Sequence, residues 1–143
     1  MAEGTEQQME MPKNGEICWT EIAVTDLDAC KSFYENVFGW QIEESKTEVS
    51  EFEYYEYDTG EGYKSGGIYE LTDEMKENNL PPHFVNYIAV DDLDASAEKV
   101  KELGGTIMVE PQEIPNTGRM CVAQDPTGAM FALLTLNSQQ EDK

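Results

Sequence analysis

The sequence contains a large excess of carboxylates but few other side chains suited to acid–base or nucleophilic catalysis. His83 is the single histidine and Arg119 the single arginine, so a Ser-His-Asp or Cys-His mechanism would have to use His83. His83 follows Pro81 and Pro82, and we expect it to have a surface or capping role. Arg119 could hold a carboxylate or phosphate through two parallel hydrogen bonds. With so many acids nearby, we expect an ion pair on the surface instead.

Glu21 is the carboxylate with the clearest functional signal. It stands inside the apolar segment ICWTEIAV (17–24), and a charge is costly to bury unless it is paired. Either it accepts a hydrogen bond from a donor such as Tyr87, or it works as an acid or base on a ligand. Both alternatives stay open, and Glu21 is the best candidate for a catalytic residue.

Three cysteines, Cys18, Cys30 and Cys121, are odd in number and show no C-x-x-C spacing. This pattern excludes a disulfide framework and a zinc site of the usual kind. Because their neighbours are apolar, we expect three buried, reduced thiols.

The chain has 143 residues, 39% of them hydrophobic, which is enough for a folded core. Its formal net charge of −21 predicts repulsion of nucleic acid and anionic membranes. No run of about 18 apolar residues is present. The first residues, MAEGTEQQMEMPKNG, do not resemble a secretory signal. We therefore expect a cytoplasmic protein without nucleic-acid or membrane partners.

The elements that must position these residues occur twice. The segment AVTDLDACKSFYENVFGW (23–40) matches AVDDLDASAEKVKELGGT (89–106) without gaps. In each copy, a β-branched and aromatic strand is followed by an aspartate, Asp26 or Asp92, at the position of a helix N-cap. A helix follows, with apolar residues at helical spacing, and a glycine near its end can adopt the left-handed conformation. The apolar helix positions are Cys30, Phe33, Tyr34 and Val37 in the first copy, and Leu93, Ala97, Val100 and Leu103 in the second.

Three further strands are expected in each copy, so each copy is a βαβββ unit of an α+β fold. One strand, EFEYYEYD (51–58), places Tyr55 and Tyr57 on one face and Tyr54, Glu56 and Asp58 on the other. Which face meets the ligand is left open. The predicted strands lie at 17–24, 40–45, 51–58 and 66–71, and at 83–90, 106–111, 119–125 and 129–136.

We predict a single domain made of both copies, flanked by solvated tails. Packed together, two curved mixed sheets would enclose a trough, with the helices outside, and a trough is the natural ligand site. The predicted segments are an N-terminal tail at 1–14, one domain at 15–136 and a C-terminal tail at 137–143; within the domain lie copy one at 15–71, a polar linker at 72–82 and copy two at 83–136.

These motifs resemble the vicinal oxygen chelate superfamily, which includes glyoxalase, bleomycin-resistance and dioxygenase-like proteins. The segment 23–40 is similar to the family's V-x-D-L-x-x-[AS]-x-x-F-Y-x-x-x-[LF]-G-W/M opening. HFVNYIAVDDLDASAEKVKELGGTI resembles its second opening, and GRMCVAQDPTGAMFALL its D-P-x-G-x-x-[FI]-x-L closing. The resemblance spans about 17–136. It implies a homodimer, because this fold usually completes its trough by pairing units between chains.

The resemblance also implies where a metal would bind in the family's enzymes. The two histidine positions are occupied here by Trp19 and Val85, and the closing glutamate position by Ala132. In the last strand of copy one, Glu70 is an uncertain match for the fourth ligand. The side chains of tryptophan, valine and alanine offer no lone pair to a metal, so we predict no metal of the glyoxalase type.

A displaced metal site is the alternative. Glu21, with Glu56 or Glu53 as a second carboxylate and His83 as a nitrogen ligand, would supply mainly hard oxygen ligands. Such ligands favour weak binding of Mg²⁺ or Ca²⁺.

Our hypothesis is a small-molecule binding or sequestering protein of the bleomycin-resistance type, without a catalytic metal. The predicted trough is lined by Trp19, Glu21, Val85, Tyr87 and Ala132. The alternative is an enzyme: a lyase, isomerase or dioxygenase-like protein that has relocated site residues and uses a metal or acid–base catalysis. A third class is a partner-binding subunit whose trough is filled by its own side chains. The identity of the ligand is not predicted.

Overall fold

The computed structural model describes residues 11–45, 53–114 and 117–137. The chain forms two compact units. The first unit is Trp19–Val85, and the second unit combines Met1–Cys18 with Asn86–Lys143. The two units correspond closely to the two sequence copies.

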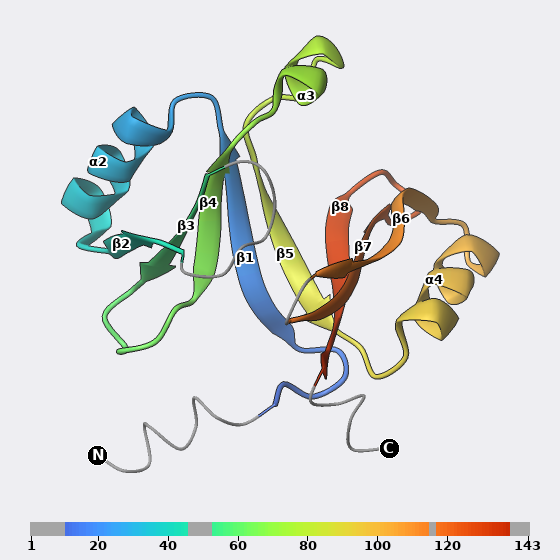
Figure 1. Ribbon diagram of the computed structural model, residues 1–143. Helices are drawn as coiled ribbons and strands as arrows, with labels where there is room; N and C mark the ends of the chain where they lie inside the picture. The colour runs from blue at the N-terminus through green and yellow to red at the C-terminus, as the bar shows by residue number, and fades with distance from the viewer. Residues whose placement is uncertain (1–10, 46–52, 115–116, 138–143) are drawn as a thin grey trace. The chain divides into compact units, whose positions relative to one another are not determined.

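The first unit contains one copy of the predicted βαβββ pattern (Figure 1). Its strands follow the order β2-β3-β4-β1, with β4 parallel to β1 and the other pairs antiparallel. Helix α2 packs on one face of this sheet. The elements are β1 (Ile17–Val24), α2 (Leu27–Phe38), β2 (Gln41–Glu44), β3 (Tyr54–Asp58) and β4 (Gly66–Glu70).

The second unit repeats this pattern and confirms the prediction of two βαβββ copies. Its strand order is β5-β8-β7-β6, and β5 is parallel to β8. Strand β6 extends past Pro111, beyond the predicted end, because it is an edge strand with register shifts that tolerate a proline. The elements are β5 (His83–Ala89), α4 (Leu93–Glu102), β6 (Thr106–Ile114), β7 (Gly118–Gln124) and β8 (Met130–Leu136).

Equivalent aspartates begin the two main helices, as predicted. Asp26 accepts a hydrogen bond from the Ala29 N–H at 3.0 Å, and Asp92 accepts one from Ala95 at 3.1 Å. Helix α2 ends at Gly39, whose φ of 78° lies in the left-handed region. Both copies therefore use the same local signals to turn from strand to helix.

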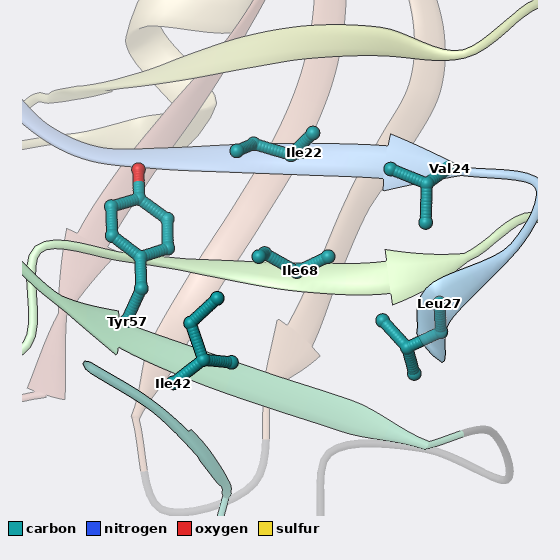
Figure 2. Packing of buried hydrophobic residues seen from close by; sticks show 6 residues of the cluster. All are labelled: Ile22, Val24, Leu27, Ile42, Tyr57 and Ile68. Carbon is teal, nitrogen blue, oxygen red and sulfur yellow. The ribbon is translucent and has the colours of Figure 1, made fainter. Parts of the chain in front are cut away.

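The core of the first unit lies between α2 and its sheet. Figure 2 shows apolar side chains of β1 and β4 beside Leu27 of the helix. Aromatic stacking extends this core, since the Trp40 and Tyr57 ring centroids are 4.2 Å apart and nearly parallel. The labelled cluster consists of Ile22, Val24, Leu27, Ile42, Tyr57 and Ile68.

The apolar side chains of α2 are not all buried. Cys30 and Tyr34 pack against the core, but Phe33 is 57% exposed and Val37 is 54% exposed. Cys30 and Tyr34 lie on one stripe of the helix, and Phe33 and Val37 lie on a neighbouring stripe about 60° away around the axis; only the first stripe packs against the core. Leu103, the C-cap residue that follows α4, is also exposed. Among the cysteines, only Cys121 is buried; Cys18 and Cys30 are half-buried.

The predicted linker contains a short helix, α3 (Asp73–Glu77), that the sequence analysis missed. Thr72 caps it by accepting a hydrogen bond from the Met75 N–H at 3.2 Å. Of the predicted tails, residues 1–10 and 138–143 lie outside the described residues, as do the first two residues of the predicted strand 51–58. No helix in the described part of the chain is long and apolar enough to cross a membrane.

Candidate functional site

The face of the first unit's sheet opposite α2 concentrates the polar and aromatic residues. Strand pairing aligns Glu56, Gly67 and Glu21 in one row across β3, β4 and β1. Because side chains alternate along a strand, all three positions belong to the face turned away from the helix. We call this surface the distal face; it carries Trp19, Glu21, Tyr54, Glu56 and Tyr69.

A chain of hydrogen bonds fixes the Glu21 carboxylate. The Tyr54 hydroxyl donates to Glu21 Oε2 at 2.8 Å, and Trp19 Nε1 donates to the Tyr54 hydroxyl oxygen at 3.0 Å. Tyr54 is buried, whereas Glu21 and Trp19 are half-buried. The carboxylate is therefore oriented from the protein interior while part of its surroundings stays exposed.

Gly67 makes this arrangement sterically possible. A Cβ atom added at Gly67 would overlap the Tyr54 hydroxyl and ring. The Tyr54 side chain starts on β3 and crosses β4 at this glycine to reach Glu21 on β1. Only a residue without a side chain leaves room for that crossing.

Gly66 leaves room for a second tyrosine, Tyr57, on the helix-side face. The Tyr57 hydroxyl donates to the Thr20 carbonyl at 2.9 Å, and a Cβ at Gly66 would overlap that carbonyl oxygen. Burial raises the pKa of Tyr57 to about 12. The structure shows which face of strand 51–58 meets the helix. Tyr57 lies in the helix-side core, and Tyr55 packs against that core.

Tyr69 completes the aromatic part of the distal face. Its ring is stacked with that of Tyr54, with centroids 6.5 Å apart and planes 23° from parallel. Burial, with a smaller contribution from the Glu21 charge, raises the pKa of Tyr69 to about 12. The Tyr69 hydroxyl thus stays protonated at neutral pH.

The structure groups some of the predicted lining residues within one unit. Trp19 and Glu21 are linked through Tyr54, as described above. Val85 closes the first unit, while Tyr87 and Ala132 are paired in register in the second unit. A trough lined by both copies remains a prediction.

Strand register identifies the fourth position of the family's metal set. Ala132 pairs with Tyr87 and Val122, in the same way that Gly67 pairs with Glu21 and Glu56. The first-copy counterpart of Ala132 is therefore Gly67, not Glu70. Glu70 has a different role, because its Oε1 accepts a hydrogen bond from Leu27 N at 3.4 Å, at the start of α2.

The residues present do not fit the family's metal. Trp19 Nε1 carries a proton that it donates to Tyr54, and neither Gly67 nor the fully buried Ala132 has a donor atom in its side chain. The displaced set is not assembled either. Across residues 11–45, 53–114 and 117–137, no three His, Cys, Asp or Glu side chains come together as a metal-binding group.

The remaining candidate residues, His83 and Arg119, make contacts within the protein. His83 Nδ1 lies 2.8 Å from the Pro81 carbonyl oxygen, and the residue borders a shallow hollow shared with Cys30 and Tyr34. Arg119 forms a two-pronged ion pair with Asp94, with N–O distances of 3.0 and 3.2 Å, which confirms the surface pairing expected for it.

Sequence reasoning missed Tyr54, Tyr69 and Gly67. One signal was available: Tyr54 and Tyr57 are three residues apart, on opposite faces of a strand, and Gly66-Gly67 begins the next strand. Adjacent glycines in a strand often mark places where another group approaches closely. The register that matches each tyrosine to its glycine comes only from the fold.

Comparison with known proteins gives the family context. The chain is 34% identical over 128 residues to the "Putative glyoxylase CFP32" of Mycobacterium bovis, covering 90% of this chain and 47% of that protein. The chain thus spans about half the length of this relative. A "Probable lactoylglutathione lyase" of Vibrio parahaemolyticus is 33% identical over 126 residues, covering 85% of this chain and 91% of that protein.

A solved structure and a family model agree with this placement. A variant of the Streptomyces coelicolor methylmalonyl-CoA epimerase, in complex with 2-nitronate-propionyl-CoA, superposes with a TM-score of 0.62 at 23% identity. The similarity covers 88% of this chain and 97% of the epimerase. Residues 16–133 match the sequence model of one family. The chain belongs to that family, the Glyoxalase/Bleomycin resistance protein/Dioxygenase superfamily.

Proposed function

We propose that this protein binds a small molecule on its distal face, in the manner of the bleomycin-resistance branch and without the family's catalytic metal. Trp19 and Tyr69 would contact the body of the ligand, and the Glu21 carboxylate would contact its polar group. The other predicted lining residues, Val85, Tyr87 and Ala132, are buried and are not part of this proposal.

The observation that carries this proposal is the hydrogen bond from Tyr54 to Glu21 across Gly67. At the position of a metal carboxylate, this chain has a glycine, and a tyrosine hydroxyl fills the space above it. A half-buried carboxylate held by a neutral donor is prepared to meet a ligand group without rearrangement, which reduces the ordering cost of binding.

A fragment screen by NMR tests this proposal. The protein contains two tryptophans, so ¹⁵N labelling resolves the indole N–H signals of Trp19 and Trp40. We expect several fragments to shift the Trp19 signal and leave that of Trp40, which is stacked on Tyr57, unchanged. If no fragment of any charge shifts the Trp19 signal, the proposed site is wrong.

An acid–base enzyme is the second candidate, because the same hydrogen bond offers a path for a proton. The Tyr54 hydroxyl and Glu21 Oε2 are 2.8 Å apart, within the range for proton transfer. Exchange of an α-proton of a carbonyl fragment into deuterated water, lost in Glu21→Gln, would support it. Binding without exchange supports the sequestering role.

We also propose a homodimer. Helix α2 exposes Phe33, Val37 and Phe38, each more than half accessible, and exposed apolar groups of this kind often mark interfaces. Light scattering should give twice the 16.1 kDa chain mass, and Phe33→Glu should return the monomer. A wild-type monomer at micromolar concentration would contradict the proposal.

A further inference from the structure

We infer that the distal face selects an organic cation, namely an ammonium group attached to an apolar or aromatic body. This inference rests on the proposed function and names the ligand class for the same site. Three features of the face support it: its charge, its aromatic surface and the rigidity of its carboxylate.

The charged side chains on the strands of the distal face, β1, β2, β3 and β4, are all carboxylates. The sequences of β1, β2, β3 and β4 contain no lysine or arginine. Glu21 and Glu56 lie on either side of Gly67 in the same row, and both are half-buried. The Tyr69 hydroxyl beside them stays protonated at neutral pH. A ligand that meets this surface must therefore compensate carboxylate charge.

Three lysines near these strands in sequence form ion pairs with other carboxylates. Lys31 pairs with Glu35 at 3.3 Å, Lys64 with Glu43 at 3.0 Å, and Lys76 with Glu70 at 4.0 Å. None of these three belongs to a strand of the distal face. An anionic ligand would find no lysine or arginine on the described strands of this face, and the chain's net charge of −21 would oppose its approach.

The aromatic surface favours a cation over a neutral hydrogen-bond donor. An ammonium group is attracted to the faces of tryptophan and tyrosine rings within about 6 Å. Trp19 and Tyr69 stand on the same face as Glu21, and both are half-buried. A carboxylate bordered by such rings can bind the charge and the apolar body of one molecule together.

Tyr54 makes the carboxylate selective by holding it in place. Its hydroxyl occupies Glu21 Oε2 on the interior side. Trp19 Nε1 in turn holds the Tyr54 hydroxyl, so the hydroxyl's own proton is directed at Glu21. Tyr54 is thus a positioning residue that acts through Glu21, and its loss should weaken cation binding less than loss of the carboxylate itself.

Benzylamine, benzyl alcohol and benzoate, which share a ring and differ in charge, test this inference in an NMR titration of the Trp19 indole signal. We expect benzylamine to bind at least about tenfold more tightly than benzyl alcohol, as expected when a hydrogen bond becomes charge-assisted. Benzoate should not bind. Glu21→Gln should remove the preference for benzylamine, and Tyr54→Phe should reduce it.

Glu77→Gln is the matched control, because it removes the same charge from helix α3, away from the distal face. It should leave the preference unchanged. If benzyl alcohol or benzoate shifts the Trp19 signal as strongly as benzylamine does, the ligand class is wrong while the proposed site stands. If benzylamine affinity falls equally in Glu77→Gln and Glu21→Gln, the preference is only a general charge effect and the inference is overturned.

Discussion

The two copies share a fold and differ on one face. In the first copy, the central row across three strands is Glu56, Gly67 and Glu21. The equivalent row in the second copy is Val122, Ala132 and Tyr87. Two residues earlier on the third strand of each copy, Tyr54 corresponds to Met120, which accepts a weak hydrogen bond from Gln112 Nε2 at 3.5 Å.

The helix-side faces, in contrast, are alike. Ile68 is fully buried in the core of the first unit, and its counterpart Leu133 is 5% exposed in that of the second. We therefore expect the stability of both copies to depend on their helix-side cores. The two carboxylates of the central row, Glu21 and Glu56, belong to the first copy.

The largest expected effect is therefore on stability and is shared by the copies. Ile68→Ala and Leu133→Ala should each lower the free energy of unfolding by about 2–5 kcal/mol, because each leaves a cavity in a packed core. Urea denaturation measures both. If one variant were nearly neutral, the two helix-side cores would not be equivalent.

Gly67 and Ala132 are the central residues of the two rows. Substituting Gly67 with the residue of the other row is expected to have the next largest effect on stability. Gly67→Ala should cost about 1–3 kcal/mol, because the added methyl group overlaps Tyr54 and must displace it. It should also shift the Trp19 indole signal upfield as the hydrogen bond to Tyr54 is lost. Ala132→Gly is the matched control, expected to cost at most about 1 kcal/mol and to leave that signal unchanged.

The two tyrosines whose side chains cross β4 allow an effect on ligand binding to be distinguished from an effect on stability. Tyr54→Phe and Tyr57→Phe each remove one hydroxyl, and each should cost about 1.5 kcal/mol. Only Tyr54→Phe should weaken ligand binding, since Tyr57 donates to a backbone carbonyl on the helix side. Equal losses of binding in both variants would show that the distal face is not the site.

Glu21→Gln should have the smallest effect on stability. The amide keeps the shape of the side chain and an oxygen that can accept from Tyr54, so the free energy of unfolding should change by less than about 1 kcal/mol. Binding of the probe should fall by a larger free energy. A variant that changes only the melting temperature would make Glu21 a structural residue.

Local signals in the sequence were sufficient to predict most of the fold. The repeat, the caps at Asp26 and Asp92 and the glycine at Gly39 all act within a few residues, and the structure contains each of them. The exposure of Phe33 could not be predicted, because apolar character does not tell which of two helix stripes the sheet will cover. The helix at Asp73–Glu77 was missed because a polar segment of five residues carries little periodicity.

The candidate site was predicted only in part, for a physical reason. The importance of Glu21 and Trp19 follows from their own strand. The contribution of Tyr54 depends on the register of β3 against β4, which is set by long-range pairing. Nothing within one strand reveals that a side chain will cross its neighbour above a glycine.

We propose that the hydrogen-bonded Tyr54–Glu21 pair takes the place of the family's metal centre. Elemental analysis of the purified protein, after incubation with excess nickel or zinc and removal of the free ions, tests this claim most directly. We expect far less than one metal per chain, and no lactoylglutathione lyase activity in the same samples. About one tightly bound nickel or zinc ion per chain would contradict the claim.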